Sequence, residues 1–157
     1  MNVRTKLLVL SLLFPILASA ACARAPKDQG AVASLTVDIP KLIEVRGAQV
    51  WLLRRADEVV IALWGISPIG GADGRYRCFI QDRLDHPFDG ETRPFLDPCR
   101  QAWWSRDGRF LGYTRDGRDV TADGPALVRI PVAVREGRVL VDTAHLDCRQ
   151  RGQMSCD

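Results

Sequence analysis

The strongest hydrophobic pattern lies in the first half of the chain, in two apolar segments at residues 49–55 and 58–67. Both are rich in Val, Ile, Leu and Trp, and Ala56 and Asp57 stand between them. Apolar, β-branched runs on either side of a short polar break are typical of two strands joined by a tight turn. We therefore predict a β-hairpin here.

A second hairpin is predicted near the C-terminus. Residues 128–134 alternate strictly between apolar and other positions, as a strand with one buried face requires. Glu136 and Gly137 supply a turn, and the apolar segment 138–142 returns from it. Pro131 has no backbone N–H to donate, so we expect the first strand to lie at a sheet edge or to turn this position outward.

Asp-Gly-Arg occurs three times, at residues 73–75, 107–109 and 116–118. Asp-Gly favours tight hairpin turns because glycine adopts positive φ without strain. The flanking segments do not match one another, so the triplets are predicted turns and not an internal repeat. Helical periodicity is absent except at residues 143–154, where one short helical turn is expected. The predicted class is all-β, with six to ten short strands.

The first 21 residues have the organisation of a signal peptide. Arg4 and Lys6 precede an apolar run at residues 7–17, which is shorter than the roughly 20 residues that span a bilayer. Two processing routes are open. The A-S-A sequence at residues 18–20 suits ordinary secretory cleavage. The following small residues and Cys22 resemble a bacterial lipobox, in which Cys22 becomes the lipid-modified first residue.

The cysteine count favours lipidation. An exported protein with an odd number of cysteines needs a separate role for one of them, and this chain has five. Lipidation of Cys22 would leave four for two disulfides, although Ser19 stands where lipoboxes usually carry an aliphatic residue. We expect a membrane-anchored periplasmic lipoprotein, with a soluble periplasmic protein as the alternative. Either location is oxidising, so disulfides would persist.

These segments define a predicted organisation. Residues 1–21 are the signal peptide, and residues 22–33, which are small and polar, are the lipidated cysteine and a flexible tether. Residues 34–147 form the β domain, and residues 148–157 form a C-terminal tail.

Composition excludes several classes of function. The formal net charge is +3, and loss of Arg4 and Lys6 with the signal peptide would lower it to +1. Arginines alternate with aspartates without forming a basic stripe, which argues against nucleic-acid binding. The sequence contains no G-x-S-x-G, H-E-x-x-H or P-loop motif, so we do not expect an enzyme.

Residues 97–110 carry the most specific signal. This segment resembles the second cluster-binding box of Rieske iron–sulfur proteins, which runs roughly C-P-C-H-G-S-x-F-D-x-x-G-R. Six positions keep the pattern: Pro98, Cys99, Trp104 as the aromatic, Asp107, Gly108 and Arg109. The wider resemblance covers residues 50–141, including the opening hairpin and a closing segment at 124–141. It implies a Rieske-like antiparallel β-sandwich or partly open barrel, with short loops at the cluster-binding tip.

The resemblance also implies that the cluster ligands are gone. A Rieske cluster needs two cysteines and two histidines. The four corresponding positions here carry non-ligands: Ser67, Ile69, Asp97 and Arg100. Gly71 keeps the turn glycine of the first box, and Ala72 replaces a cysteine that forms a disulfide in the family. We expect no cofactor where the family would hold a 2Fe–2S cluster, and no other metal.

The same resemblance suggests the disulfides. Cys99 occupies the family's disulfide position, and Cys78 lies six residues after the missing partner at Ala72, so Cys78–Cys99 is the expected replacement pair. Cys148–Cys156 would then staple the C-terminal tail. From the sequence alone, three pairings of four cysteines remain open. A metal site in the loop with Cys78 and His86 lacks any known ligand spacing, so that loop is expected to be an exposed polar segment.

The adjacent Trp103 and Trp104 should point to opposite faces of a strand. Both could be packing residues, or one could face outward near the former cluster site. Because Trp and Arg are common in binding hot spots, we expect Arg100, Trp103 and Trp104 to be candidates for a partner-binding face.

The resulting hypothesis is a clusterless Rieske-like subunit with a structural, accessory or assembly role in a membrane-associated electron-transfer complex. Two alternatives stay open. One is a genuine 2Fe–2S electron carrier with atypical ligands. The other is an unrelated β-sandwich envelope lipoprotein that binds a small ligand.

Overall fold

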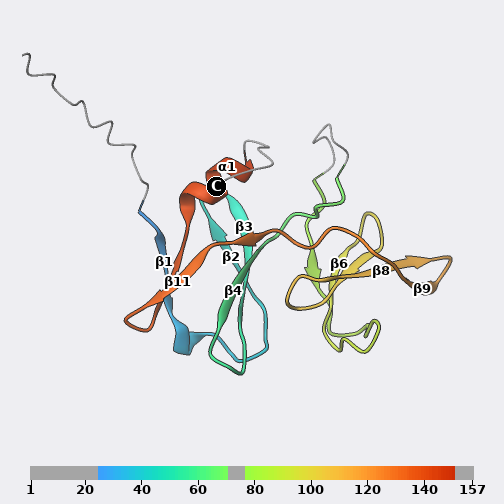
Figure 1. Ribbon diagram of the computed structural model, residues 1–157, viewed down its shortest axis with the longest axis horizontal. Coiled ribbons are helices and arrows are strands. Elements are labelled where there is room, and N and C mark those ends of the chain that lie inside the picture. The colour runs from blue at the N-terminus through green and yellow to red at the C-terminus, as the bar shows by residue number, and fades with distance from the viewer. Residues whose placement is uncertain (1–24, 71–76, 151–157) are drawn as a thin grey trace, which may run out of the picture.

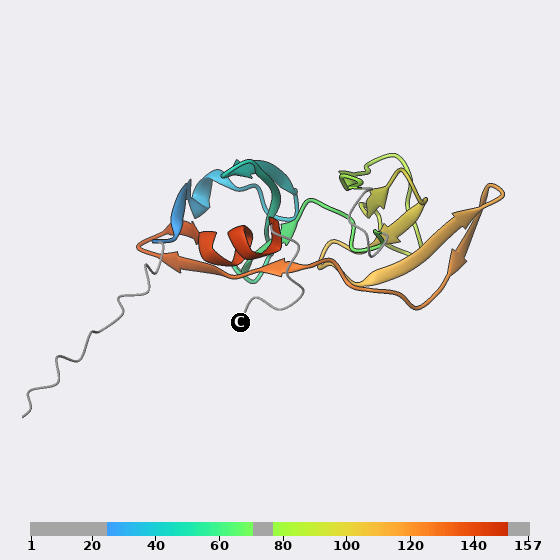
Figure 2. The same cartoon turned by 90° about the horizontal axis from the view of Figure 1, so that it is seen from above.

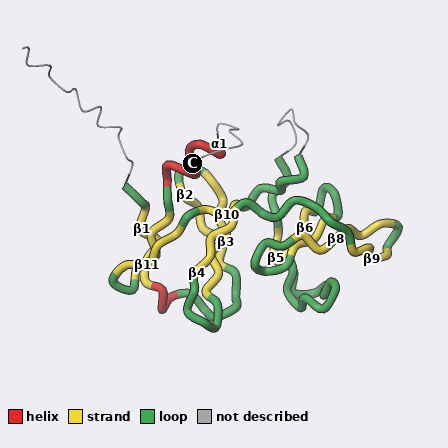
Figure 3. Tube along the Cα trace, viewed as in Figure 1, coloured by secondary structure: helices red, strands yellow, loops and turns green. Residues whose placement is uncertain are grey.

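The computed structural model describes residues 25–70 and 77–150, which form twelve strands, one 3-10 helix and one α-helix arranged in two lobes (Figure 1). We name residues 25–66 and 128–150 the basal lobe and residues 67–127 the tip lobe; Figure 3 shows that the tip lobe has more loop than strand. Every strand pair described is antiparallel, and none of the sheets closes into a barrel. Strands outnumber the predicted six to ten because several contain only two or three residues.

The basal lobe contains two sheets. The first has the order β1 (Lys27–Ala31), β12 (Arg138–Val141) and β11 (Val132–Arg135). The second has the order β10 (Arg129–Ile130), β4 (Val60–Trp64), β3 (Ala48–Arg54) and β2 (Lys41–Val45). A 3-10 helix, η1 (Val32–Ser34), follows β1, and the helix α1 (Thr143–Gln150) follows β12.

The tip lobe is built on a third sheet. Its order follows the sequence: β5 (Gln81–Asp82), β6 (Phe95–Asp97), β7 (Ala102–Trp104), β8 (Phe110–Arg115) and β9 (Arg118–Thr121). Asp116 and Gly117 both have positive φ, at 52° and 71°, in the turn between β8 and β9. The predicted Asp-Gly turn at 116–118 is therefore confirmed, as is the turn at 107–109; the triplet at 73–75 lies outside the described residues.

The predicted hairpin at 49–67 is confirmed as β3 and β4, with Leu52 paired to Ala62. Both strands are buried on both faces, because Val50 and Leu52 face the basal core while Trp51 and Leu63 face the tip lobe. A strand covered on both sides reads as a continuous apolar run, which is the pattern seen in the sequence.

Pro131 divides the predicted strand 128–134 in two. Before it, β10 pairs with β4; after it, β11 pairs with β12 in the other sheet. Both short strands lie at sheet edges, as the missing N–H of proline requires. The return hairpin is confirmed by the pairing of Val134 with Val139 across the turn.

The predicted flexible tether at 22–33 is wrong for its described part. β1 pairs with β12, with Lys27 opposite Val141 and Asp28 opposite Leu140. The Asp28 carboxylate also accepts a hydrogen bond from Arg138. Edge pairing satisfies the backbone of a polar segment that carries no hydrophobic pattern, so the β domain begins before residue 34.

The C-terminal boundary of the β domain also differs from the predicted one at residue 147. The short helical turn expected within 143–154 is the two-turn helix α1, whose start is capped by the Asp142 carboxylate, an acceptor for Ala144 N at 2.8 Å. Leu146 is fully buried in the basal core. The domain therefore extends past residue 147. No helix within the described residues is long and apolar enough to cross a membrane.

The described residues form three hydrophobic clusters, one of which joins the two lobes. The basal core lies between the first two sheets and α1, around Val50, Leu52 and Val141. A second cluster joins the lobes, because Trp51 and Leu63 of the basal lobe pack with Phe95, Trp104 and other residues of the third sheet. A third, smaller cluster covers the opposite face of that sheet. Figure 2 shows the two lobes side by side along the long axis.

Candidate functional site

The turn between β6 and β7 is organised by Asp97. Its Oδ1 accepts hydrogen bonds from the backbone N–H groups of Cys99 at 2.8 Å and Arg100 at 3.2 Å. An aspartate that accepts amides two and three residues ahead is the usual way to start a tight turn. Asp97 is fully buried, although it stands where the Rieske pattern has a cluster ligand. Its role in the fold is to shape the turn.

The loop before the third sheet is closed at its base by backbone pairing. Ser67 N donates to Cys78 O at 2.9 Å, and Ile80 N donates to Gly65 O at 3.0 Å. Gly65 is required here, because a Cβ at this position would lie 2.8 Å from the Cβ of Gln49. The Ser67 side chain is buried and accepts a hydrogen bond from Ile69 N at 3.2 Å. Gly71 and Ala72 lie outside the described residues.

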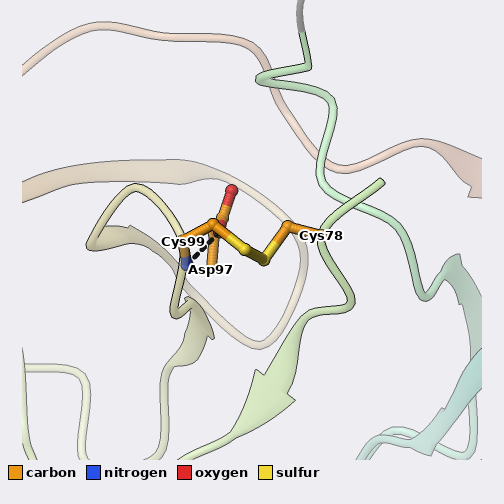
Figure 4. A group of neighbouring side chains, drawn as sticks. All are labelled: Cys78, Asp97 and Cys99. Atoms are coloured by element: carbon orange, nitrogen blue, oxygen red, sulfur yellow. Dashed lines mark hydrogen bonds between the residues drawn. A yellow bond between two sulfur atoms is a disulfide. The ribbon is translucent and has the colours of Figure 1, made fainter. Parts of the chain in front are cut away.

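A disulfide connects the loop to the turn. Cys78 and Cys99 are bonded, with their Cα atoms 6.2 Å apart, which confirms the predicted pair (Figure 4). One oxygen of Asp97 and the two sulfur atoms all lie within 4.8 Å of one another. Cys148 also takes part in a disulfide. Its predicted partner Cys156 lies outside the described residues, so that pairing stays a prediction.

Beside the disulfide, the surface forms an open hollow of about 700 Å³. Its lining combines the two boxes with the β8–β9 hairpin and consists of Ile69, Arg100, Tyr113, Thr114, Arg115, Val120 and Ala122. Two of these residues are arginines and none is acidic. Tyr113 and Val120 are cross-strand partners, so they contribute one continuous apolar surface to the lining. The hollow suits a partner or ligand that has a negative charge beside an apolar group.

The hollow was only partly predicted. The structure brings together Ile69 and Arg100, which the sequence placed at former ligand positions, but it adds Tyr113, Arg115 and Val120. No sequence signal placed the β8–β9 hairpin beside the two boxes. That arrangement follows from the sheet order, in which β7 lies between β6 and β8.

The residues present do not fit a Rieske cluster. Ile69 has no atom that could bind iron, and its side chain packs against the hydrophobic cluster that joins the lobes. Arg100 is an exposed cation, and Asp97 is engaged in its turn. The two nearest thiols are consumed by the Cys78–Cys99 disulfide, whereas thiolates are the groups that hold iron–sulfur clusters. Among the described residues, these two cysteines and Asp97 are also the one set of three potential metal ligands that lies together.

The two tryptophans are not the exposed anchors that the sequence allowed. Trp103 is 3% exposed and Trp104 is fully buried. They do face opposite sides of the third sheet, but both sides are covered. Trp104 lies in the cluster that joins the lobes, and its Nε1 donates to Pro125 O at 2.8 Å. The packing interpretation therefore replaces the partner-binding one for both residues.

The side of Trp103 is covered by the segment between β5 and β6. His86 stacks on Trp103 with ring centroids 4.7 Å apart, and Phe88 stacks on it at 5.5 Å. His86 Nε2 also lies 3.2 Å from the Asp119 carboxylate. The predicted exposed loop is thus partly a cover for the sheet. His86 is not part of any three-residue ligand set found in the described residues.

Comparisons with known proteins agree with this architecture. No protein-family profile matches the chain, and no curated protein matches it. Among solved structures, the quaternary ammonium Rieske monooxygenase CntA superposes with a TM-score of 0.53 at 14% identity. The match covers 76% of this chain and 31% of the CntA chain. At this identity it shows the fold alone: the chain has a Rieske-like fold that corresponds to about a third of the oxygenase.

Two smaller proteins match over most of their length but superpose less well. One is described as the small subunit of an NADH-dependent nitrite reductase from Mycobacterium tuberculosis, with 23% identity over 73% of this chain and 91% of that chain, and a TM-score of 0.40. The other is the E. coli protein NirD, with 14% identity over 74% and 94% and a TM-score of 0.43.

Proposed function

We propose that this chain is an exported, clusterless Rieske-like protein that serves as a structural, accessory or assembly subunit of a membrane-associated electron-transfer complex. It is anchored through a lipid on Cys22, it docks through the hollow, and it has no catalytic activity of its own. The observation that carries the proposal is a hollow on a Rieske-like fold whose lining has two arginines and no acidic residue and includes Ile69 and Arg100, which the resemblance places at ligand positions.

The replaced residues favour docking over electron transfer. Ile69 and Arg100 stand at former histidine positions, and both line the hollow. Tyr113 and Arg115 belong to the same lining. Tyrosine and arginine are the residues most enriched in binding hot spots, together with tryptophan. The occupant we infer is an acidic surface of a redox subunit, because the lining carries two cations and no carboxylate.

Export is supported by two independent features. Residues 1–22 have the order of a lipoprotein signal, with basic residues, an apolar run and a cysteine. The described part of the chain also contains a disulfide, which persists in oxidising compartments and is rare in the cytosol.

The first experiment tests for a cluster. The full chain, produced by an export route, is assayed for iron and sulfide and for visible absorption. We expect a colourless, iron-free and folded protein. Stoichiometric iron with a Rieske-type spectrum would make the protein an electron carrier and contradict the proposal.

The second experiment tests the hollow. The tagged full chain is purified with its membrane partners from the source organism after mild crosslinking. Arg100→Glu with Arg115→Glu should lower partner recovery at least tenfold, because like charges placed at an interface cost several kcal/mol. Lys41→Glu with Arg135→Glu changes the net charge equally on exposed strands of the basal lobe and should leave recovery unchanged. Equal recovery of all three proteins would refute docking at the hollow.

The size of the hollow supports a second candidate, a lipoprotein that binds a small ligand. Its volume of about 700 Å³ falls within the roughly 300–1,000 Å³ of small-molecule sites. Octanoate has the required charge and apolar chain, and octanol is a matched neutral probe. Calorimetric binding of octanoate alone, lost in Arg100→Glu, would favour this candidate over a docking role.

A further inference from the structure

The Cys78–Cys99 disulfide is accessible from one side only. Cys78 is 6% exposed, whereas Cys99 is exposed in the turn between β6 and β7. A thiolate arriving from solvent therefore meets Cys99 more readily than Cys78. Arg100, which is also exposed, follows Cys99 directly, and a neighbouring cation stabilises a thiolate.

One oxygen of the Asp97 carboxyl group lies within 4.8 Å of both sulfurs, and only one of its two oxygens has a hydrogen-bond partner among the described residues. Oδ1 holds the turn through two amides, but Oδ2 is buried and has no hydrogen-bond partner among the described residues. A buried polar atom left unpaired is destabilising, so its retention calls for a reason. The turn itself does not supply one, because Oδ1 alone makes the turn contacts.

These features together are those of a redox-active disulfide. The geometry points to thiol–disulfide exchange between Cys78–Cys99 and a protein dithiol, with Cys99 as the attacked sulfur, Cys78 as the leaving sulfur and Asp97 as the group that carries its proton. This activity is independent of the docking role, because it uses neither the lipid anchor nor a membrane partner.

The exchange proceeds in two balanced steps. A thiolate of the dithiol bonds to Sγ of Cys99, the bond between the two cysteines breaks, and its electron pair goes to Sγ of Cys78, which takes a proton through the Asp97 carboxyl group. The second thiol of the dithiol then loses its proton and attacks its own partner sulfur in the mixed disulfide, which releases Cys99 as a thiolate. The dithiol is oxidised to a disulfide, and Cys78–Cys99 is reduced by two electrons.

The reverse reaction gives Asp97 its clearest role. Cys78 is buried, so solvent cannot readily take its proton when it must attack a mixed disulfide at Cys99. The Asp97 carboxyl group can, because one of its oxygens lies within 4.8 Å of both sulfurs. Asparagine at this position keeps the carbonyl oxygen that the turn needs and loses the proton acceptor, so Asp97→Asn separates the two functions.

The first test uses the full chain with both disulfides formed and dithiothreitol as the dithiol probe. Reduction of each disulfide is followed by alkylation and mass spectrometry, with the disulfide of Cys148 as the internal reference. We expect Cys78–Cys99 to be reduced at least about tenfold faster than the reference, and Asp97→Asn to slow re-oxidation by oxidised glutathione at least about tenfold. Circular dichroism reports whether the variant stays folded.

The second test does not depend on the folding of the Asp97 variant. Cys78→Ser leaves Cys99 as a free exposed thiol, and Cys99→Ser leaves Cys78 as a free buried one. The first should react with the probe disulfide DTNB at least about tenfold faster than the second. Equal thiol reactivity, or a Cys78–Cys99 bond no more reducible than the reference, would overturn the proposal. So would stoichiometric zinc binding by the reduced protein without faster exchange.

Discussion

Asp97 explains how the protein itself shapes the β6–β7 turn. In a cluster-bearing box, the residue at this position is a thiolate ligand, and the iron centre holds the turn. Here the carboxylate accepts two backbone amides, at 2.8 Å and 3.2 Å, and the following Pro98 restricts the chain. These contacts set the shape of the turn.

A second carboxylate, Asp107, gives a prediction at the same scale. The hydrogen bond from the Ser105 hydroxyl, together with backbone amides, holds the pKa of Asp107 below its ordinary value. Its folded pKa is thus lower than its unfolded pKa, so the stabilisation is present above the unfolded value and is lost as the pH falls through the folded one. Asp107→Asn should flatten the loss of unfolding free energy between neutral and acidic pH, measured by urea denaturation.

The control for this prediction is Asp116→Asn, which neutralises an exposed carboxylate in the β8–β9 turn. It should leave the acid dependence close to that of the unchanged protein. An acid dependence that is identical for all three proteins would show that the Ser105 contact does not stabilise the ionised form of Asp107.

At the level of elements, β1 makes a testable contribution. A chain that starts at Ser34 would lose the strand and its pairing with β12, as well as the bond from Val32 N to Gly137 O at 2.8 Å. At about 1 kcal/mol net for each backbone hydrogen bond, we expect a loss of about 2–3 kcal/mol in unfolding free energy by urea denaturation. A chain that starts at Ala25 is the control. Equal unfolding free energies for the two chains would show that residues 25–33 act as a tether and do not stabilise the domain.

The β elements differ in how far local sequence determines them. The β3–β4 and β11–β12 hairpins could be predicted because alternation and turn residues lie within a short window. β1 could not, because its polar residues form a strand only when β12 is beside them. β5 and β6 contain two and three residues, too few for any period to show.

The candidate site likewise contains some features that the sequence predicts and others that depend on contacts between distant segments. Cys78–Cys99 could be predicted because a family position fixed one cysteine and the nearest remaining cysteine supplied the other. The burial of both Trp103 and Trp104 could not, since it requires the segment containing His86 and Phe88 to fold over the second face of the sheet. The hollow depends on the placement of a hairpin that is distant in sequence from Ile69.

At the scale of the whole molecule, the shared cluster couples the two lobes. Trp51 of the basal lobe and Phe95 of the tip lobe have ring centroids 5.4 Å apart, and Phe95 is fully buried. Phe95→Ala should cost about 3–5 kcal/mol, because a large cavity would open between the lobes. Thermal unfolding followed at both near-UV and far-UV wavelengths should still show one transition, at a lower temperature.

Phe79 provides the matched control, since it is the same residue type in the tip lobe but is 48% exposed. Phe79→Ala should change the unfolding free energy by no more than about 0.5 kcal/mol. If Phe95→Ala instead separated unfolding into two transitions, the lobes would be independently stable and the shared cluster would be only a contact between them.

The pairing of β1 also limits how far the domain can move from a membrane. If Cys22 carries the lipid, five peptide steps separate the anchor from Lys27, and a fully extended chain spans at most about 3.6 Å per residue. The distance between the lipid anchor and Lys27 is then at most about 18 Å. Since β1 and the β8–β9 hairpin lie at opposite ends of the molecule (Figure 1), the basal lobe would stay close to the lipid headgroups while the tip lobe could point away from them. The distance between the bilayer and the surface that binds a docking partner would then be restricted to a narrow range.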